Sequence, residues 1–303
     1  DLADANPGSI EFFAGDLMEP GSFGQAMQGC QVVFHVASPF ATSVDDPQRD
    51  LVDPAVKGTR NVLETANATP SVKRVVVTSS CAAIYGSNAD LAKTPNGVFT
   101  EDIWNTSSTL ENGPYYLSKT LAEKEAWSIV GDQDRWSLVT INPCMVLGPG
   151  VKIHEGSESF SMVKQFGDGS LSTGMPDLGI GVVDVREVAE AHFRAGFLPE
   201  ASGRYILAAH DTSFPAMADA LRPRFGDRFP IPSRVLPKWL VWIVGPWVSD
   251  ALTRRFVTEN IGLPWRSDNT KSREELGITY RPLEETLGDF FDQMIDAGVL
   301  TPR

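Results

Sequence analysis

Apolar runs of strand length alternate with segments of helical periodicity in the first half of the chain. Residues 74–78 read RVVVT, an uninterrupted β-branched run that is typical of a strand buried on both faces. Residues 32–36 and 136–142 form similar runs. Residues 47–67 and 115–130 carry apolar positions at helical spacing, with charged residues between them. This β-α-β-α order predicts a doubly wound α/β fold, a parallel sheet with helices on both faces.

The pattern also predicts elements outside this central region. Residues 9–14 read as a short strand and 21–28 as a short helix, whereas 185–195 predict a helix and 204–208 a strand. After Gly150 the sequence becomes richer in Gly, Ser, Pro and aromatic residues. We therefore expect a dinucleotide-binding domain over 1–150 and a smaller, mainly helical substrate lobe over 151–303, with elements of about 183–209 returning to the first domain.

The longest apolar stretch, Leu236–Val248, contains Trp239, Trp242 and Trp247. It is too short and too interrupted by proline and glycine to span a bilayer. A helix on a lipid surface is an alternative, but the interruptions and the acidic charge of the chain disfavour it. We expect these tryptophans to pack in the core of the lobe.

Composition excludes several classes of protein. The 303 residues are 42% hydrophobic and 21% charged, which is ordinary for a soluble globular protein. Lys plus Arg number 26 and Asp plus Glu number 39, giving a net charge of −13 that repels nucleic-acid backbones. The three cysteines form no CxxC motif and the four histidines have no metal-ligand spacing. We therefore expect a reduced, cytoplasmic protein with no metal, no nucleic-acid partner and no membrane partner.

The strongest chemical signal lies in the predicted helix 115–130. Tyr115 and Lys119 are four residues apart, so their side chains point the same way. An ammonium beside a phenol stabilises the phenolate and lowers the tyrosine pKa, which makes Tyr115 a usable general acid. Ser80 follows the buried strand 74–78, at the edge where open α/β sheets bind ligands. Its hydroxyl is placed to hold a substrate carbonyl against Tyr115.

Several motifs in order resemble those of the extended short-chain dehydrogenases/reductases. The resemblance is to the branch of dihydroflavonol reductases, cinnamoyl-CoA reductases and bacterial aldehyde or ketone reductases, and it runs nearly the whole length. The motifs are Gly15–Leu17 (GDL), Phe34–Pro39 (FHVASP), Pro54–Leu63 (PAVKGTRNVL), Val77–Ser80 (VTSS), Tyr115–Lys119 (YYLSK), Asn142–Pro149 (NPCMVLGP) and Val183–Ala189 (VDVREVA). The implied fold is a Rossmann-type sheet.

The resemblance implies a site and a cofactor, NADPH or NADH, with NADPH favoured. Ser80, Tyr115 and Lys119 would form the catalytic triad, and Lys119 would also bond the nicotinamide ribose. Asp16 would bind the adenine amino group with Leu17 beside it, and Ser159 would reach the phosphates. Pro143 and Val146 would lie near the nicotinamide. The other implied cofactor-binding residues are Val36, Ala37 and Ser38 along the path from the adenosine to the nicotinamide, and Thr78, Tyr115 and Lys119. Asp16 as a plain turn residue and Pro143 as a strand end remain alternatives.

Two departures from the family pattern stand out. Family members begin with a strand, a GxxGxxG turn and a helix that binds the cofactor diphosphate, but no glycine-rich turn precedes Gly15. We therefore expect that an N-terminal βαβ unit is missing and that this chain alone is impaired in cofactor binding and stability. Residues 112–116 read NGPYY in place of the NWYCY of plant cinnamoyl-CoA reductases, which favours a bacterial-type carbonyl reductase.

The predicted reaction is reduction of an aldehyde or ketone, a small-molecule substrate, by a monomer or homodimer. A nucleotide-sugar epimerase or dehydratase with tightly bound NAD⁺ is one alternative. A non-catalytic dinucleotide-sensing module or an inactive fragment is another. Phe40, Cys81, Ala82 and Met145 neighbour the catalytic motifs and are candidate substrate contacts, although Cys81 is equally typical of a small core residue.

Overall fold

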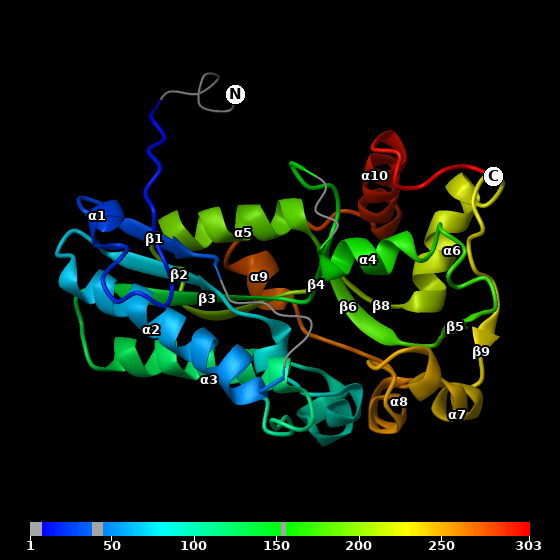
Figure 1. The fold of residues 1–303 in the computed structure, drawn as a ribbon. Coiled ribbons are helices and arrows are strands. Elements are labelled where there is room, and N and C mark those ends of the chain that lie inside the picture. Colours follow the sequence, from blue (N-terminus) through cyan, green and yellow to red (C-terminus); the bar gives the residue numbers. More distant parts are fainter. Residues whose placement is uncertain (1–7, 38–44, 153–155) are drawn as a thin grey trace.

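The computed structural model describes residues 8–37, 45–152 and 156–303 (Figure 1). Its main sheet has four parallel strands in the order β1-β2-β3-β7. Their bounds are β1 Val32–His35, β2 Arg74–Thr78, β3 Ser137–Pro143 and β7 Gly203–Leu207. The pattern of apolar runs therefore predicted all four strands to within a residue or two.

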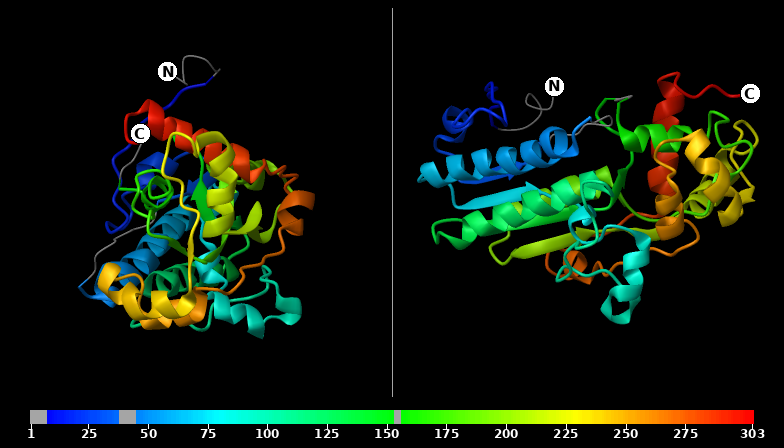
Figure 2. Two further views of the ribbon diagram at one scale, coloured as in Figure 1. Left: turned by 90° about the vertical axis from the view of Figure 1, so that its right-hand side faces the viewer. Right: turned by 60° about the horizontal axis from the view of Figure 1, so that its bottom comes forward.

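Helices cover both faces of this sheet. Helices α2 (Asp53–Ala68) and α3 (Pro114–Gly131) lie side by side on one face, and α5 (Val185–Phe197) lies on the other (Figures 1 and 2). Successive residues of a strand face opposite sides, so Val75 packs toward the α2 and α3 side while Val76 packs toward α5. Both valines are completely buried. The predicted doubly wound α/β fold is confirmed.

The remaining elements form short connections and a mainly helical lobe. In the first half they are α1 Gly24–Met27, η1 Gln48–Val52, η2 Cys81–Ala83, η3 Asn88–Lys93 and η4 Pro95–Gly97. In the second half they are β4 Met145–Leu147, α4 Glu158–Lys164, β5 Met175–Pro176, β6 Gly179–Asp184, β8 His210–Ser213, α6 Phe214–Phe225, β9 Val235–Leu236, α7 Lys238–Val248, α8 Arg254–Asn260, α9 Thr270–Glu274 and α10 Leu283–Asp296. None of the described helices is long and apolar enough to cross a membrane.

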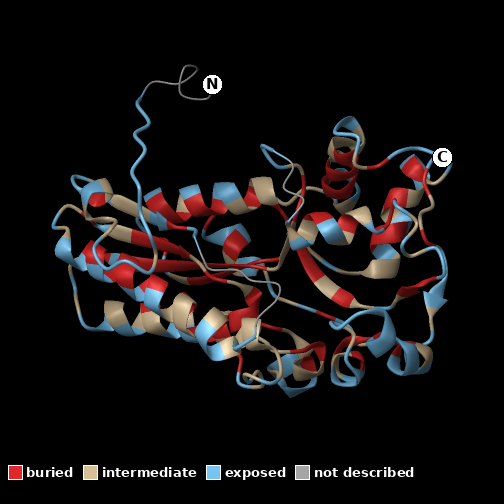
Figure 3. Cartoon of the chain, viewed as in Figure 1, coloured by how far each residue is buried: buried red, intermediate tan, exposed pale blue. Residues whose placement is uncertain are grey.

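The lobe has a hydrophobic core of its own. Helices α4, α6 and α10 contribute Phe160, Phe225 and Phe291, and the first strand of the small sheet β4-β6-β8 contributes Leu147. Figure 3 shows these buried segments at the end of the molecule opposite α1. The strands of this small sheet were not anticipated from the sequence, because runs of three to six residues give too short a pattern to recognise.

Two expectations were wrong. Residues 9–14 form no strand, and Phe12 is 94% exposed, because no described strand lies alongside to share a hydrogen-bond ladder. The tryptophans of α7 do not pack in the core. Val241 and Gly245 fill the buried side of that helix, so Trp239 and Trp247 on the opposite side are 65% and 87% exposed.

Candidate active site

Helix α3 positions the two residues that carried the sequence prediction. Gly113 precedes it with φ of +74°, a conformation that favours glycine, and Pro114 occupies its first turn, where a missing N–H costs nothing. Tyr115 and Lys119 then lie one turn apart. The Lys119 Nζ is 5.7 Å from the centroid of the Tyr115 ring. Both side chains therefore share one face of α3, as the spacing predicted.

Ser80 reaches this pair from the sheet. It follows β2, and its Oγ accepts a hydrogen bond from the Ala82 N–H at 3.1 Å, which caps η2. Burial raises the pKa of Tyr115 to about 12, while a hydrogen bond with the Ser80 hydroxyl acts in the opposite direction. The net shift is opposite to the lowering that the sequence predicted, because desolvation of the phenolate is its largest cause.

Lys119 lies beside a buried imidazole. Burial lowers the pKa of Lys119 to about 8. Burial also lowers the pKa of His35, at the end of β1, to about 4, and the positive charge of Lys119 adds to that effect. His35 is therefore neutral near pH 7, and Lys119 carries the positive charge of this pair.

A cavity opens along the carboxyl ends of β1 and β2. Its lining residues are Leu17, His35, Ala37, Ala55, Thr59, Val77, Thr78, Ser79, Lys119, Ala122 and Glu123. Apolar walls thus surround one ammonium, one carboxylate, one imidazole and several hydroxyls. The cavity brings together four of the residues predicted to bind a cofactor, Leu17, Ala37, Thr78 and Lys119.

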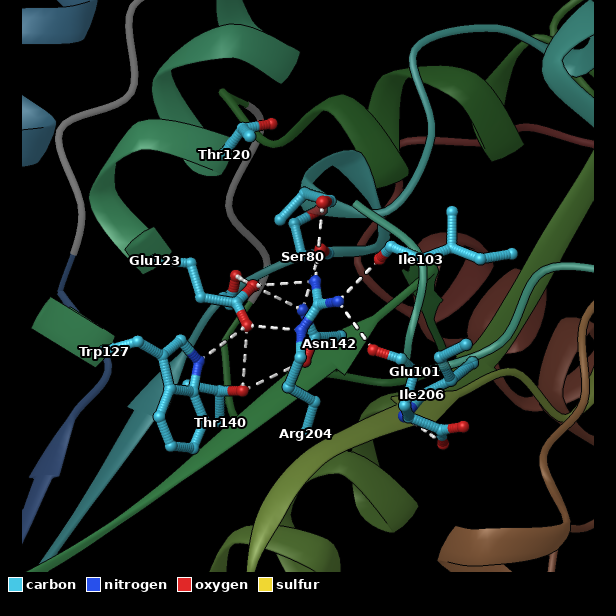
Figure 4. Close-up of polar contacts among 12 residues, drawn as sticks. Ser80, Glu101, Ile103, Thr120, Glu123, Trp127, Thr140, Asn142, Arg204 and Ile206 are labelled. Atoms are coloured by element: carbon cyan, nitrogen blue, oxygen red, sulfur yellow. Dashed lines mark hydrogen bonds and ion pairs between the residues drawn. The ribbon is translucent and has the colours of Figure 1, made fainter. Parts of the chain in front are cut away.

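A buried carboxylate next to this cavity ties α3 to the sheet (Figure 4). Glu123 accepts hydrogen bonds from Ser79 Oγ at 2.5 Å and from Asn142 Nδ2 at 2.7 Å. Arg204 of β7 forms an ion pair with Glu123, Nε to Oε1 at 2.7 Å, and both side chains are almost fully buried. Thr140 Oγ1 and Trp127 Nε1 also donate to Glu123. These donors satisfy a charge that burial would otherwise disfavour.

The same network fixes the segment that carries Ser80. Asn142 Nδ2 donates to the Ser80 carbonyl oxygen at 3.1 Å, and Arg204 donates to the carbonyl oxygens of Glu101 and Ile103 at 2.7 and 2.6 Å. Figure 4 shows these contacts converging from α3, β3 and β7. The relative position of Ser80 and α3 is therefore set by buried polar contacts.

Asp16, Val36 and Pro143, also predicted to bind the cofactor, are not among the residues that line this cavity. Asp16 is exposed and its Oδ1 accepts from the Met18 N–H at 2.8 Å, which is the turn geometry that the alternative interpretation proposed. Val36 is 60% exposed and Pro143 is buried within β3. Ser38 and Phe40 lie outside the described residues.

A second hollow, between β4, α4 and α10, holds another subset. Val146 and Ser159, two residues predicted to bind the cofactor, both line it. Met145 adjoins it, because its sulfur accepts from Ser159 Oγ at 3.5 Å. Thr78 lines the first cavity and not this hollow, and its hydroxyl lies 2.6 Å from His192 Nε2.

The remaining substrate candidates are buried. Cys81 is 3% exposed and belongs to a core cluster with Ile84, Phe99 and Trp265, and Ala82 is 4% exposed. The sulfur of Cys81 lies 2.7 Å from that of Cys144, and both are free thiols. Contact of Cys81 or Ala82 with a substrate remains a prediction.

His35, Glu123 and Arg204 belong to this region, although the sequence patterns did not predict a role for them. The position of Glu123 could have been predicted from the sequence, since it continues the four-residue spacing of Tyr115 and Lys119 along one helix face. No sequence pattern pairs Arg204 with Glu123, because 81 residues separate them.

Comparisons with known proteins identify the family of the chain. The sequence profile of the NAD dependent epimerase/dehydratase family matches residues 2–203. A cinnamoyl-CoA reductase, CAD2, of Medicago truncatula is 32% identical over 288 residues, which are 94% of this chain and 79% of that relative. The NADPH complex of Gre2 from Candida albicans shares the fold with a TM-score of 0.73 and 30% identity, covering 93% of this chain and 82% of that chain.

A third relative is of the same kind. The yeast methylglyoxal/isovaleraldehyde reductase Gre2, complexed with NADPH, has a TM-score of 0.72 and 29% identity, and the match covers 94% of this chain and 83% of that chain. Profile, sequence relatives and fold thus agree. The chain belongs to the NAD-dependent epimerase/dehydratase family, within the reductase branch of the extended short-chain dehydrogenases/reductases.

Proposed function

We propose that the chain is an NAD(P)H-dependent reductase of an aldehyde or ketone, with Ser80, Tyr115 and Lys119 as its catalytic residues. One observation carries the assignment: the Ser80 hydroxyl bonds the Tyr115 phenol, and Lys119 lies one turn away with its Nζ 5.7 Å from the phenol ring. Membership of a family of NAD(P)-dependent oxidoreductases supports it. NADPH is the proposed cofactor, since it is the one bound in the two Gre2 relatives.

The cavity residues fit part of a nicotinamide dinucleotide. Leu17 and Ala37 offer apolar contact to a ring, and Lys119 offers an ammonium donor for ribose hydroxyls. In our proposal these residues and Thr78 hold the cofactor, with Val146 and Ser159 of the second hollow farther along it. The remaining predicted contacts, Asp16, Val36, Ser38 and Pro143, stay part of the proposal. A bound nicotinamide supplies the hydride for reduction.

The residues of this chain then perform the proton transfer. Tyr115, with its pKa at about 12, is protonated near neutral pH and donates its proton to the developing alkoxide. Ser80 donates a hydrogen bond to the same oxygen and holds it beside the phenol. Lys119, with its pKa at about 8, is largely protonated near neutral pH and favours the phenolate that proton donation leaves behind.

Titration of the purified 303-residue chain with NADPH, and then with NADH, followed by fluorescence, tests the cofactor. Saturable binding that is tighter for NADPH than for NADH is the expected result, and its affinity tests the expectation that this chain alone is impaired in cofactor binding. A panel of aldehydes and ketones then tests turnover, and one NADPH should be consumed for each carbonyl reduced. Tightly bound NAD⁺ without net consumption would instead identify an epimerase or dehydratase. A chain that binds NADPH but reduces none of these carbonyls would contradict the proposal.

Tyr115→Phe tests the mechanism. Loss of the phenol proton should lower turnover by about 100-fold or more, because general acid catalysis contributes at least that much, while NADPH affinity stays nearly unchanged. Tyr116→Phe is a matched control, since Tyr116 is the next residue on α3 and its hydroxyl bonds Tyr85 rather than Ser80. Equal turnover of the Tyr115→Phe variant and the parent chain would exclude the assigned role.

A further inference from the structure

Helix α7 presents an apolar face to solvent on the lobe. Only Val241 and Gly245 of this helix are buried, and Val241 packs on Val257 of α8. Trp239, Trp242 and Trp247 are 65%, 40% and 87% exposed. Figure 3 shows most of α7, at the lower right of the view of Figure 1, in the colour of exposed residues.

The exposed residues form one continuous stripe. Trp239, Ile243 and Trp247 follow at intervals of four, and Trp242 lies beside them, so they share one face of the helix. Residues 239–248 read WLVWIVGPWV and contain no charged side chain. The indole N–H groups are their only side-chain hydrogen-bonding groups. Exposed apolar patches of this kind mark an interaction site.

The charge around the stripe is opposite to that of the whole molecule. The chain has 26 basic and 39 acidic residues, whereas residues 234–255 have four basic residues and one acidic residue, Asp250. The Arg254 guanidinium lies 4.8 Å from the centroid of the Trp242 ring, at the border of the apolar face. Lys238 and Arg234 are exposed at the other end of the helix. The stripe therefore has a basic border on an acidic protein.

We propose that α7 docks this chain on an anionic lipid surface. The helix would lie in the plane of the membrane, with its three tryptophans at the headgroup boundary and with Lys238 and Arg254 at lipid phosphates. Tryptophan suits this position because its ring is apolar while its N–H needs a polar partner. At 11 residues α7 lies on a bilayer rather than across it.

Two other occupants fit the stripe less well. A second copy of the chain in a symmetric dimer would bring the basic border against its own equivalent, and like charges would oppose each other. A protein partner normally makes directional hydrogen bonds across an interface, and the stripe offers only indole N–H groups for them. A lipid surface requires few such bonds and supplies the complementary negative charge. Arg255 is already paired with Glu259, and the Lys238 ammonium donates to the Thr258 carbonyl oxygen at 2.9 Å, a neutral partner that leaves its charge in place. In the proposal, Lys238, Arg254 and Arg234 carry the attraction.

Co-sedimentation of the chain with vesicles tests the proposal. Vesicles of phosphatidylcholine with phosphatidylglycerol should bind the chain, and vesicles of phosphatidylcholine alone should bind it more weakly. Binding should weaken as salt concentration rises. The double variant Trp239→Ser/Trp247→Ser should lose about tenfold or more of the binding, because it removes the most exposed indoles. Both side chains are exposed, so the variant should fold like the parent chain.

A control and a charge variant make the test specific. Phe193→Ser/Phe197→Ser removes two aromatic side chains that are 63% and 57% exposed on α5, and it should bind the mixed vesicles as the parent does. Lys238→Glu/Arg254→Glu should reduce binding of mixed vesicles to the level of pure phosphatidylcholine.

Three results would overturn the proposal. One is failure of the parent chain to bind the mixed vesicles. Another is equal binding by the parent and the tryptophan double variant. The third is a dimer in sedimentation velocity that the tryptophan variant abolishes, which would identify a second copy as the occupant of α7.

Discussion

Lys119 is held in a position that favours its neutral form. Burial lowers its pKa from 10.5 to about 8, so the folded chain binds this proton less tightly than the unfolded chain does. The proposed chemistry nevertheless needs the ammonium beside Tyr115. At this residue the requirements of function and stability therefore oppose each other, as is common for groups with strongly shifted pKa values.

Lys119→Met should stabilise the folded chain near neutral pH by about 1–3 kcal/mol, because it removes a buried charge and keeps the side-chain volume. This gain in stability should be complete below about pH 8 and should shrink between pH 8 and 10.5. The reason is that the folded wild-type chain loses the Lys119 proton near pH 8, whereas the unfolded chain loses it only near pH 10.5. Melting temperatures of the variant and the parent chain, measured across this pH range, test whether the substitution stabilises the fold. Lys124→Met, at an exposed position of the same helix, should change them little at any pH. A lower melting temperature for Lys119→Met at pH 7 would contradict the account.

A buried ion pair is one of the contacts that attach α3 to the sheet. Glu123 and Arg204 have side chains that are 0% and 8% exposed, and the donors around Glu123 come from β3 and α3 as well as β7. Helix α3 also carries Tyr115 and Lys119. The pair thus holds the helix and the end of β2 in the register that the proposed chemistry needs.

Glu123→Gln should destabilise the chain by about 3–5 kcal/mol, because it leaves the Arg204 guanidinium buried without a counter-charge. Glu125 provides a matched control two residues along α3, since its ion pair with Arg60 is partly exposed, with Arg60 48% exposed. Glu125→Gln should cost less than about 1 kcal/mol. Denaturant unfolding of both variants measures the difference. Similar losses of stability in the two variants would contradict the expectation that the buried Glu123 pair matters more to stability than the partly exposed Glu125 pair.

At the scale of the whole molecule, the sheet and the lobe have separate cores. One core surrounds α4, α6 and α10 and includes Phe291, whereas the cores on the two faces of the main sheet are built around β2 and β3. The first cavity is lined from the main sheet and the helices α2 and α3, and the second hollow mainly from β4, α4 and α10 of the lobe. Such an arrangement allows the lobe to open locally while the sheet stays folded.

Phe291→Ala should therefore act mainly on the lobe. Deleting this fully buried ring should cost about 3–5 kcal/mol through lost contacts and a cavity. Hydrogen–deuterium exchange should accelerate in α4, α6 and α10 and change little in β2 and β3. Phe197→Ala, at a ring that is 57% exposed, should leave exchange nearly unaltered. Uniform acceleration in the sheet and the lobe would indicate a single cooperative unit instead.

Much of the candidate site was predictable because its residues belong to local patterns. Spacing along one helix places Tyr115 and Lys119 on the same face, and a buried β-branched run followed by serines places Ser80 at a strand end. The roles of these residues and of the cofactor contacts remain proposals. His35 and Arg204 escaped prediction, because their importance comes from neighbours on other elements.

The sequence by itself determined the strands of the main sheet, its helices and the face on which the Tyr–Lys pair lies, because each follows from periodicity within one short segment. Tertiary structure alone decided two further features. It decided that burial raises the pKa of Tyr115, since desolvation depends on what surrounds the phenol. It also decided that the tryptophans of α7 face solvent. The buried residues of that helix are Val241 and Gly245, and an apolar run does not reveal which of its sides the rest of the chain will bury.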